Sequence, residues 1–204
     1  MTKERWLSWP NRMTMLRIIL IGPFVVLLLN INSPNWCWAR HLAILVFGIM
    51  AISDGLDGWL ARKFHQETRL GRFLDPVADK LLITCAMILL GFEETAVPGF
   101  KLPSWVVVSA IGKDLFVVVG FLLVFLETGK IFIKPSAIGK ACTAAQMFLL
   151  ILTLIAPDLT EISEMMKLIV IVTTRILWGI TTVLAMLTCW DYFRSGMRFA
   201  ETSK

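Results

Sequence analysis

Six long, uninterrupted apolar segments dominate this sequence and restrict the folds that it can adopt. They cover residues 13–30, 42–60, 74–90, 103–126, 138–155 and 167–189. Each is close to the roughly 17 to 25 residues that an α-helix needs to cross a lipid bilayer. Transmembrane β-strands would instead alternate apolar and polar residues. Because 57% of the residues are hydrophobic and 17% are charged, we predict an all-α polytopic membrane protein with six transmembrane helices and a single domain, residues 1–204.

Lysine and arginine gather in alternate connections between the apolar segments. One side of the membrane would receive Lys3, Arg5, Arg12, Arg62, Lys63, Arg69, Arg72, Lys130, Lys134, Lys140, Arg194, Arg198 and Lys204, and the other side Arg40, Lys101 and Lys167. Since positively charged connections stay in the cytoplasm, we predict an integral protein of the inner cell membrane with both termini on the cytoplasmic face. This topology and the anionic lipid headgroups account for the net charge of +5, so we expect no nucleic-acid partner.

The first residues, MTKERWLSWPNR, look retained rather than cleaved as a signal peptide, because the apolar run that follows is long and lacks a small-residue cleavage site. Trp6, Leu7 and Trp9 stand beside Lys3 and Arg5. This arrangement fits a short N-terminal helix lying in the membrane interface. It fits an aromatic anchor for the first transmembrane helix equally well.

Four aspartates flank the connection between the second and third apolar segments. A charge at a membrane boundary is costly unless a metal, a partner charge or water stabilises it. On a helix that turns by about 100° per residue, one face of roughly 140° holds Asp54, Asp57, Gly58, Ala61 and Arg62, and a second face of about 80° holds Gly71, Asp75 and Asp79. Two antiparallel helices would therefore direct all four carboxylates into one cavity at the cytoplasmic end.

These carboxylates indicate a metal site. Hard divalent cations such as Mg²⁺ or Mn²⁺ prefer oxygen ligands, and four carboxylates can hold two ions. Zinc is not expected, because neither histidine of the chain pairs with a cysteine. Gly58 and Ala61 leave space for a neighbouring helix or a flat ligand group, and Arg62 is a ready phosphate partner. Taken singly, these residues also fit plainer roles: a helix contact, a positive-inside arginine and a solvated helix end.

Together the residues spell DxxDGxxAR, eight further residues and GxxxDxxxD. This pattern resembles the signature of the CDP-alcohol phosphotransferase family, membrane enzymes that transfer a substituted phosphoryl group from a CDP-activated donor to an alcohol. The resemblance implies six spans, a cytoplasm-facing site and two metal ions, with Asp54, Asp57 and Asp75 as ligands and Asp79 as ligand and base. It also implies that the CDP donor contacts Gly58, Ala61, Arg62, Thr68 and Gly71.

The resemblance extends through most of the chain. The opening PNRMTMLRIILIGP is similar to the PNxxTxxR entry of two branches of the family, which make phosphatidylglycerophosphate and cardiolipin. It implies that Pro10, Asn11 and Thr14 help to hold the nucleotide. From the residues alone, Asn11, Thr14 and Arg17 also fit the start of an interfacial helix. FLDPVADK and IGKACTAAQM resemble the same branches, which implies CDP-diacylglycerol as the lipid donor.

The acceptor has to be inferred from residues outside the signature. Lys113, inside the fourth apolar segment, and Lys140, at the start of the fifth, are costly to bury unpaired and suit an anionic acceptor such as glycerol 3-phosphate. Alternatively, Lys113 pairs with Asp114 or extends its amine to the membrane surface. Many glycerophosphate-using members of the family have arginine and glutamate at this pair of positions. Lysine and aspartate here resemble CMP-forming cardiolipin synthases, whose acceptor is phosphatidylglycerol. We favour glycerol 3-phosphate and keep phosphatidylglycerol as the alternative.

Two other classes of function fit parts of the sequence. Intramembrane carboxylates also mark ion pathways, but a divalent-cation carrier would place its polar groups near the bilayer midplane, with broken helices and repeat symmetry. A catalytically inactive binding subunit is disfavoured because all four aspartates are present. The sequence leaves open whether the protein forms a homodimer and what Arg175 does.

Overall fold

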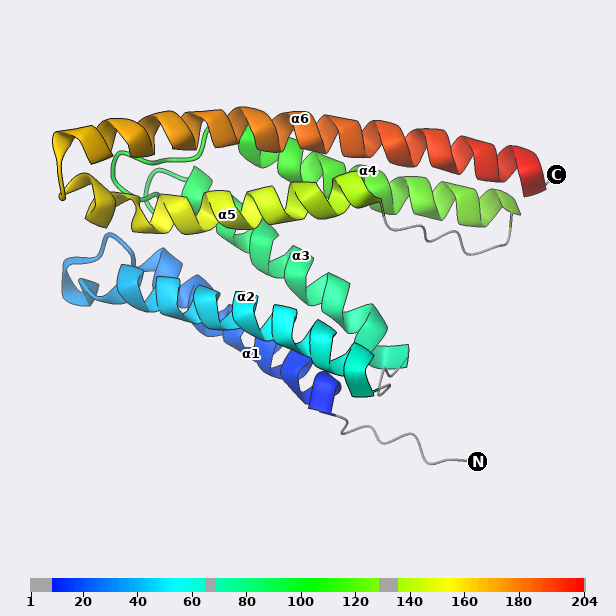
Figure 1. Cartoon of the computed structure of the whole chain (residues 1–204), viewed down its shortest axis with the longest axis horizontal. Helices are drawn as coiled ribbons and strands as arrows, with labels where there is room; N and C mark the ends of the chain where they lie inside the picture. Colours follow the sequence, from blue (N-terminus) through cyan, green and yellow to red (C-terminus); the bar gives the residue numbers. More distant parts are fainter. Residues whose placement is uncertain (1–8, 65–68, 129–135, 204) are drawn as a thin grey trace. The chain divides into compact units, whose positions relative to one another are not determined.

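The structure is a computed structural model that describes the backbone of residues 9–64, 69–128 and 136–203, and the side chains of residues 15–53, 80–120, 122–123, 126 and 136–198. Every regular element in these ranges is helical: α1 (Trp9–Leu29), the 3₁₀ helix η1 (Pro34–Trp36), α2 (Ala39–Phe64), α3 (Arg69–Gly91), α4 (Ser104–Thr128), α5 (Ala137–Thr160) and α6 (Glu164–Ser203) (Figure 1). The all-α prediction is thereby confirmed for the described residues. The interfacial helix predicted around Trp6 and Leu7 lies outside them.

The helix boundaries follow the apolar segments closely, with two differences. α6 is 40 residues long and reaches Ser203, whereas the apolar pattern predicts an end at residue 189. Its last part, DYFRSGMRFAETS, contains no proline and extends the helix in a polar sequence. The short helix η1 between α1 and α2 begins with a proline, whose fixed φ suits a first helical turn. Apolar periodicity alone does not predict either feature.

Two of the described helices are long and apolar enough to cross a membrane: α5, and α6 over Glu164–Arg198. Shorter apolar stretches occupy Met15–Leu29, Ala39–Ser53 and Lys80–Gly91, in α1, α2 and α3. The six transmembrane spans therefore stay a prediction.

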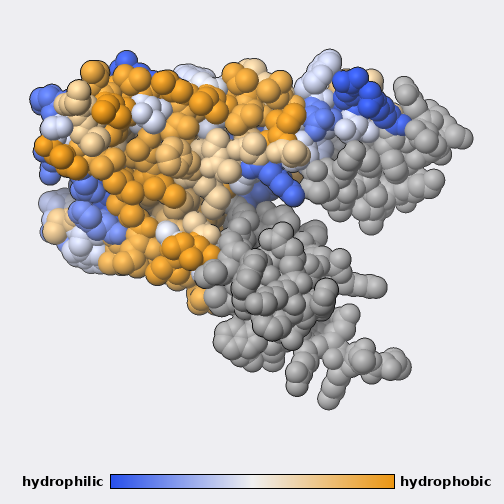
Figure 2. Space-filling model, in the orientation of Figure 1, coloured by the Kyte–Doolittle hydropathy of each residue, from blue (hydrophilic) through white to orange (hydrophobic). Residues whose placement is uncertain are grey.

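The surface of the long helices is apolar as well. On α6, Met165, Leu168, Val172, Ile176 and Ile180 are exposed one after another at intervals of three or four residues. Figure 2 shows apolar residues over much of the coloured surface. Soluble proteins rarely expose continuous apolar surface of this kind, whereas helices in contact with lipid commonly do so. The chain is therefore a membrane protein.

The first of two compact units, Met1–Lys101, is built around α1, which packs against both α2 and α3. The rings of Phe24 in α1 and Phe47 in α2 lie 5.6 Å apart at an angle of 37°. Asn32, after α1, donates hydrogen bonds from Nδ2 to the backbone oxygens of Glu94 (3.0 Å) and Ala96 (2.9 Å) beyond α3. These bonds hold the two connections at this end of the unit together.

The second unit, Leu102–Lys204, is built around α6, which packs against α4 and α5. Thr174, Thr181 and Thr188 recur every seven residues on the buried face of α6. Each hydroxyl donates to the backbone oxygen four residues earlier, at 2.7, 2.8 and 2.7 Å. Because their polar groups are satisfied within the helix, these small side chains can line a close helix contact in an apolar environment.

Candidate active site

The buried face of α2 leads directly into the first half of the aspartate signature. Ala39, Ala43, Phe47 and Met50 are buried at intervals of four, four and three residues. Continued along the helix at intervals of four, three and four, the same face passes through Asp54, Asp57 and Ala61, whose backbone is helical and continuous with the rest of α2. Gly58 and Arg62 each follow one of these positions.

The buried face of α3 leads into the second half. Leu82, Ile83, Ala86, Met87 and Leu90 are buried on α3. Steps of four residues back from Ile83 reach Asp79, Asp75 and Gly71, all within the helical backbone of α3. By helix register, Asp54 and Asp57 lie on the same face of α2 as the buried residues that precede them. Asp75 and Asp79 lie on the same face of α3 as the buried residues that follow them.

α1 contributes a third face, and it contains a buried charge. Leu28, Phe24 and Arg17 are buried on α1, and the side chain of Arg17 is only 1% exposed. One turn back from Arg17 the same face reaches Thr14, which the entry-segment resemblance assigns to the donor together with Asn11. α1 is the helix that contacts both α2 and α3. A buried guanidinium needs anionic or polar surroundings, so this part of the unit suits a site rich in carboxylates.

The metal-ligand prediction depends on side chains that lie outside the described part of the structure. The side chains of Asp54, Asp57, Asp75 and Asp79 are among these, and Thr68 lies wholly outside the described residues. Among the side chains that are described, no group of three or more histidine, cysteine, aspartate or glutamate residues is placed to hold a metal ion. The four carboxylates offer a set of oxygen donors of the kind that hard divalent cations prefer.

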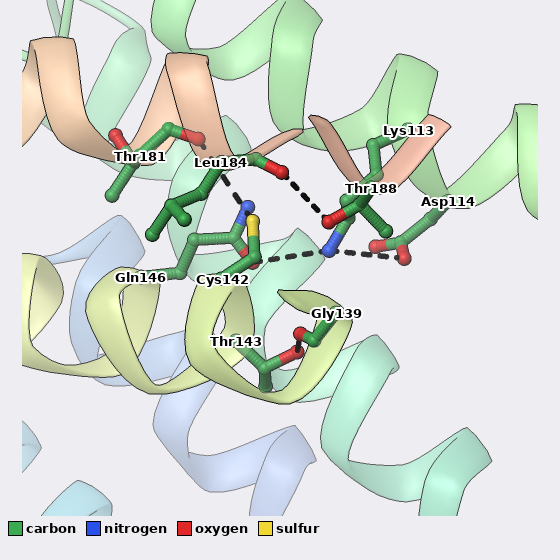
Figure 3. Close-up of polar contacts among 9 residues, drawn as sticks. All are labelled: Lys113, Asp114, Gly139, Cys142, Thr143, Gln146, Thr181, Leu184 and Thr188. Carbon is green, nitrogen blue, oxygen red and sulfur yellow. Dashed lines mark hydrogen bonds and ion pairs between the residues drawn. The ribbon is translucent and has the colours of Figure 1, made fainter. Parts of the chain in front are cut away.

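The second unit contains the lysine predicted to bind the acceptor. Lys113 lies on α4 with 5% of its side chain exposed, so its amine does not extend to the surface. Its Nζ atom is 3.4 Å from Oδ1 of Asp114 and 3.5 Å from Oε1 of Gln146 on α5 (Figure 3). The pairing with Asp114 that the sequence left as an alternative is therefore present. Both distances exceed the roughly 2.7 to 2.9 Å of a strong charge-assisted hydrogen bond.

The ammonium group therefore keeps capacity for a further ligand, since it has three protons to donate. Lys113 also lines a pocket of about 400 Å³ between α4 and α6. The other residues that line the pocket are Ser109, Gly112, Phe116, Ala185, Met186, Cys189, Trp190 and Phe193. Lys113 is the charged group in this largely apolar lining.

Lys140, the second predicted acceptor residue, has a different environment. It lies exposed in the first turn of α5, so the cost of burial that singled it out applies to Lys113 and not to Lys140. Ser136 caps this helix and donates a 2.5 Å hydrogen bond from Oγ to Oδ2 of Asp191 on α6. The turn that bears Lys140 is thereby fixed to α6. The structure brings Lys113 together with Asp114 and Gln146, and leaves Lys140 at the surface.

Two residues of these sites were not singled out from the sequence. From the sequence, Arg17 was considered only as a polar residue at helical spacing from Asn11. Gln146 was considered only as part of the segment IGKACTAAQM, with no role of its own. Each is 1% exposed. A polar residue inside an otherwise apolar helical segment is the signal that could have identified both, because such residues are costly unless they have a role.

Comparison with known proteins gives a consistent result. The profile of the CDP-alcohol phosphatidyltransferase family matches residues 7–190. A protein of Bacillus subtilis named CDP-diacylglycerol–glycerol-3-phosphate 3-phosphatidyltransferase is 36% identical over 150 residues, which are 68% of this chain and 72% of the relative. Proteins of the same name from Rickettsia bellii and Salmonella typhimurium are 33% and 35% identical. The alignment with the Rickettsia bellii protein covers 93% of this chain and 96% of the relative. The alignment with the Salmonella typhimurium protein covers 74% of this chain and 78% of the relative.

Proposed function

Because this chain belongs to the CDP-alcohol phosphatidyltransferase family, we propose that it transfers the phosphatidyl group of CDP-diacylglycerol to glycerol 3-phosphate, releasing CMP. The product would be phosphatidylglycerophosphate, an intermediate of glycerophospholipid synthesis. The choice of acceptor is carried by the relatives named for this reaction, one of which aligns with 93% of the chain. The family match favours an enzyme over the divalent-cation carrier that the sequence also allowed.

We propose that the site lies at the cytoplasmic end of six transmembrane helices in the inner cell membrane. Asp54, Asp57, Asp75 and Asp79 would hold two divalent cations, Mg²⁺ or Mn²⁺, whose charge, when bound, offsets that of the donor pyrophosphate. The register of these positions on the buried faces of α2 and α3 supports this assignment.

The remaining donor contacts come from α1, the end of α2 and the start of α3. The signature resemblance assigns donor contact to Gly58, Ala61, Arg62, Thr68 and Gly71, and the entry-segment resemblance assigns it to Asn11 and Thr14. Glycine and alanine let the nucleotide approach the α2 backbone closely, and Arg62 offers a planar pair of donors to a phosphate. Thr14 lies one turn before Arg17 on the buried face of α1, which supports its assignment, whereas Asn11 lies about 120° around the helix from Arg17.

In the transfer, the acceptor hydroxyl oxygen forms a bond to the phosphorus that carries diacylglycerol. The bond from this phosphorus to the oxygen of CMP breaks, and CMP leaves with the electron pair. Asp79 takes the proton of the hydroxyl group as a general base. The acyl chains of the donor can stay among the membrane lipids, because only the polar head has to enter the site.

We propose that Lys113 binds the phosphate group of glycerol 3-phosphate, with Lys140 as a second, more exposed contact. The long contacts of the Lys113 ammonium to Asp114 and Gln146 support this role, because they leave it able to bind an anion. A buried ammonium binds an anion more strongly than a hydrated one, since water competes less for either charge.

Comparison of acceptors tests the proposed reaction. The purified protein is incubated in detergent with CDP-diacylglycerol and Mg²⁺, and receives either glycerol 3-phosphate or phosphatidylglycerol in separate reactions. Mass spectrometry identifies the lipid product of each. We expect phosphatidylglycerophosphate from the first reaction and no new lipid from the second. Cardiolipin from the second reaction alone would select the alternative acceptor, which the Lys113–Asp114 pair brought into consideration.

A further inference from the structure

Gln146 is a deeply buried polar residue that the proposed reaction does not use. It lies on α5 with 1% of its surface exposed, and its Oε1 atom accepts from the Lys113 ammonium at 3.5 Å. Its Nε2 atom has no hydrogen-bond partner among the described residues. A buried donor without a partner costs free energy, so a residue that keeps one needs an explanation.

Rotation of the amide group cannot supply the missing partner. Exchange of Oε1 and Nε2 would turn two N–H donors toward an ammonium that can only donate. The Lys113 charge therefore fixes the amide with its oxygen toward Nζ and its nitrogen elsewhere. The pair consequently offers hydrogen-bond donors to a ligand, while the acceptor atom of the amide is already engaged by Lys113.

The neighbouring polar side chains do not compete for the Gln146 amide. Thr143 donates to the backbone oxygen of Gly139 at 3.1 Å, and Thr188 donates to that of Leu184 at 2.7 Å (Figure 3). Thr181 donates to the backbone oxygen of Leu177 in its own helix. The Cys142 thiol lies 3.8 Å from the backbone oxygen of Thr181. Three buried side-chain donors on α5 and α6 have no partner among the described residues, Gln146 Nε2, Thr153 Oγ1 and Trp178 Nε1, and Gln146 is the residue of these that contacts the Lys113 ammonium.

We propose that Gln146 is a specificity residue for a phosphorylated acceptor: it holds the Lys113 ammonium in place through Oε1 and donates from Nε2 to an oxygen of the acceptor phosphate. This rests on the proposed function, in which Lys113 binds that phosphate. A phosphate group has several oxygens that accept hydrogen bonds and, as a dianion, none that donates, so it matches a pair of groups that offers only donors. An uncharged alcohol would add no anionic partner for the buried ammonium beyond Asp114, which lies 3.4 Å from it.

The variant Gln146→Glu tests the inference. Glutamate keeps the length of the side chain and an oxygen beside Lys113, but it replaces the Nε2 donor with a charge that repels phosphate. We expect the KM for glycerol 3-phosphate to rise about 10- to 100-fold, the size of a lost hydrogen bond to a charged group. The kcat and the KM for CDP-diacylglycerol should change by less than about twofold, because a residue that only binds the acceptor affects neither.

Thr153→Val is the matched control. Thr153 lies seven residues beyond Gln146 on the same buried face of α5, and its hydroxyl also has no partner among the described residues. Valine has nearly the same shape. We expect this variant to keep the wild-type KM for both substrates, since the Thr153 hydroxyl makes no hydrogen bond to Lys113. If Gln146→Glu does not fold, Gln146→Met removes both polar atoms without a new charge and is expected to raise the same KM.

The results separate this inference from the proposed function. If the wild-type protein makes no lipid from glycerol 3-phosphate, the proposed function fails. If the wild type does so and Lys113→Met raises the acceptor KM, but Gln146→Glu changes it by less than about twofold, the inference for Gln146 alone is overturned. It is also overturned if both substrate KM values rise equally, which would indicate a structural role. In the double variant Lys113→Met/Gln146→Glu, we expect little increase beyond Lys113→Met, because the two residues act on one phosphate.

Discussion

Single charged residues decide what each part of this chain can do. Lys113 and Lys140 are both lysines at or within an apolar segment, yet one is 5% exposed and the other lies at the surface of a capped helix start. A buried ammonium has lost most of its water, and two long contacts compensate its charge only in part, so it can bind an anionic ligand. An exposed one adds a weaker and more strongly screened attraction. Lys113 is therefore the residue to which we assign most of the acceptor affinity.

The residue-scale prediction concerns Asp79. Asp79→Asn removes a negative charge and a proton acceptor at almost unchanged volume, so we expect kcat to fall by at least ~100-fold with the fold retained. The rate of CMP release measures the effect, and circular dichroism checks the helices. Wild-type turnover in this variant would refute the assigned role.

Glu93→Gln provides the control for Asp79→Asn. Glu93 is an exposed carboxylate beyond α3, and a 2.6 Å hydrogen bond from Lys101 together with the lysine charge lowers its pKa. Glu93 is therefore ionised at neutral pH, and the control removes the same kind of charge. We expect unchanged activity and unchanged stability, because exposed ion pairs contribute little.

At the scale of the helices, the register of each buried face determines where the signature residues lie. The buried faces of α2 and α3 continue, at intervals of three and four residues, into the positions of the aspartate signature, and the buried face of α1 continues to Thr14 of the entry segment. In the second unit, small residues bring α5 and α6 close together. An ideal Cβ atom at Gly139 would lie 3.5 Å from Cγ2 of Thr188 and 3.8 Å from Cε2 of Tyr192.

The element-scale prediction follows from this close approach. Gly139→Leu places atoms beyond Cβ where Thr188 and Tyr192 already are, so we expect a destabilisation of about 1 to 3 kcal/mol. Gly139→Ala should be tolerated, because its Cβ makes ordinary van der Waals contacts. Gly120→Leu on α4 is the control, since nothing lies within 4 Å of its Cβ position. Unfolding in detergent measures all three. Equal stability of the two leucine variants would contradict the packing described.

The apolar pattern predicted the helices well for a physical reason. Each segment has to be apolar along its whole length, and this property is visible in the residues themselves. Which face packs on a neighbour depends on the rest of the molecule, so Arg17 and Gln146 were not identified as buried from the sequence. The polar extension of α6 to Ser203 was missed because nothing apolar marks it. The signature residues were identified by their pattern, and their roles as ligands and base stay predictions.

At the scale of the whole molecule, topology and function depend on each other. A water-soluble acceptor such as glycerol 3-phosphate has to reach the site from one side of the membrane, and the distribution of lysine and arginine predicts that this side is the cytoplasm. The family profile extends through both compact units, from residue 7 to residue 190. We therefore propose that the two units act as one enzyme domain.

Cysteine labelling tests this orientation. Cys37 is exposed in the connection between α1 and α2, which we predict to face away from the cytoplasm. With Cys85, Cys142 and Cys189 replaced by serine, a membrane-impermeant maleimide should label Cys37 in intact spheroplasts. A cysteine introduced by Ser203→Cys, in a variant that also lacks Cys37, should react only after the membrane is permeabilised. The reverse pattern would contradict the predicted topology.

The central claim is that glycerol 3-phosphate is the acceptor, and the most direct test is to follow its carbon atoms. Purified protein receives CDP-diacylglycerol, Mg²⁺ and isotopically labelled glycerol 3-phosphate, and CMP and labelled lipid are counted in the same reaction. The account predicts one labelled phosphatidylglycerophosphate for each CMP released, and neither product when a chelator removes the metal. CMP release without label in the lipid would contradict it.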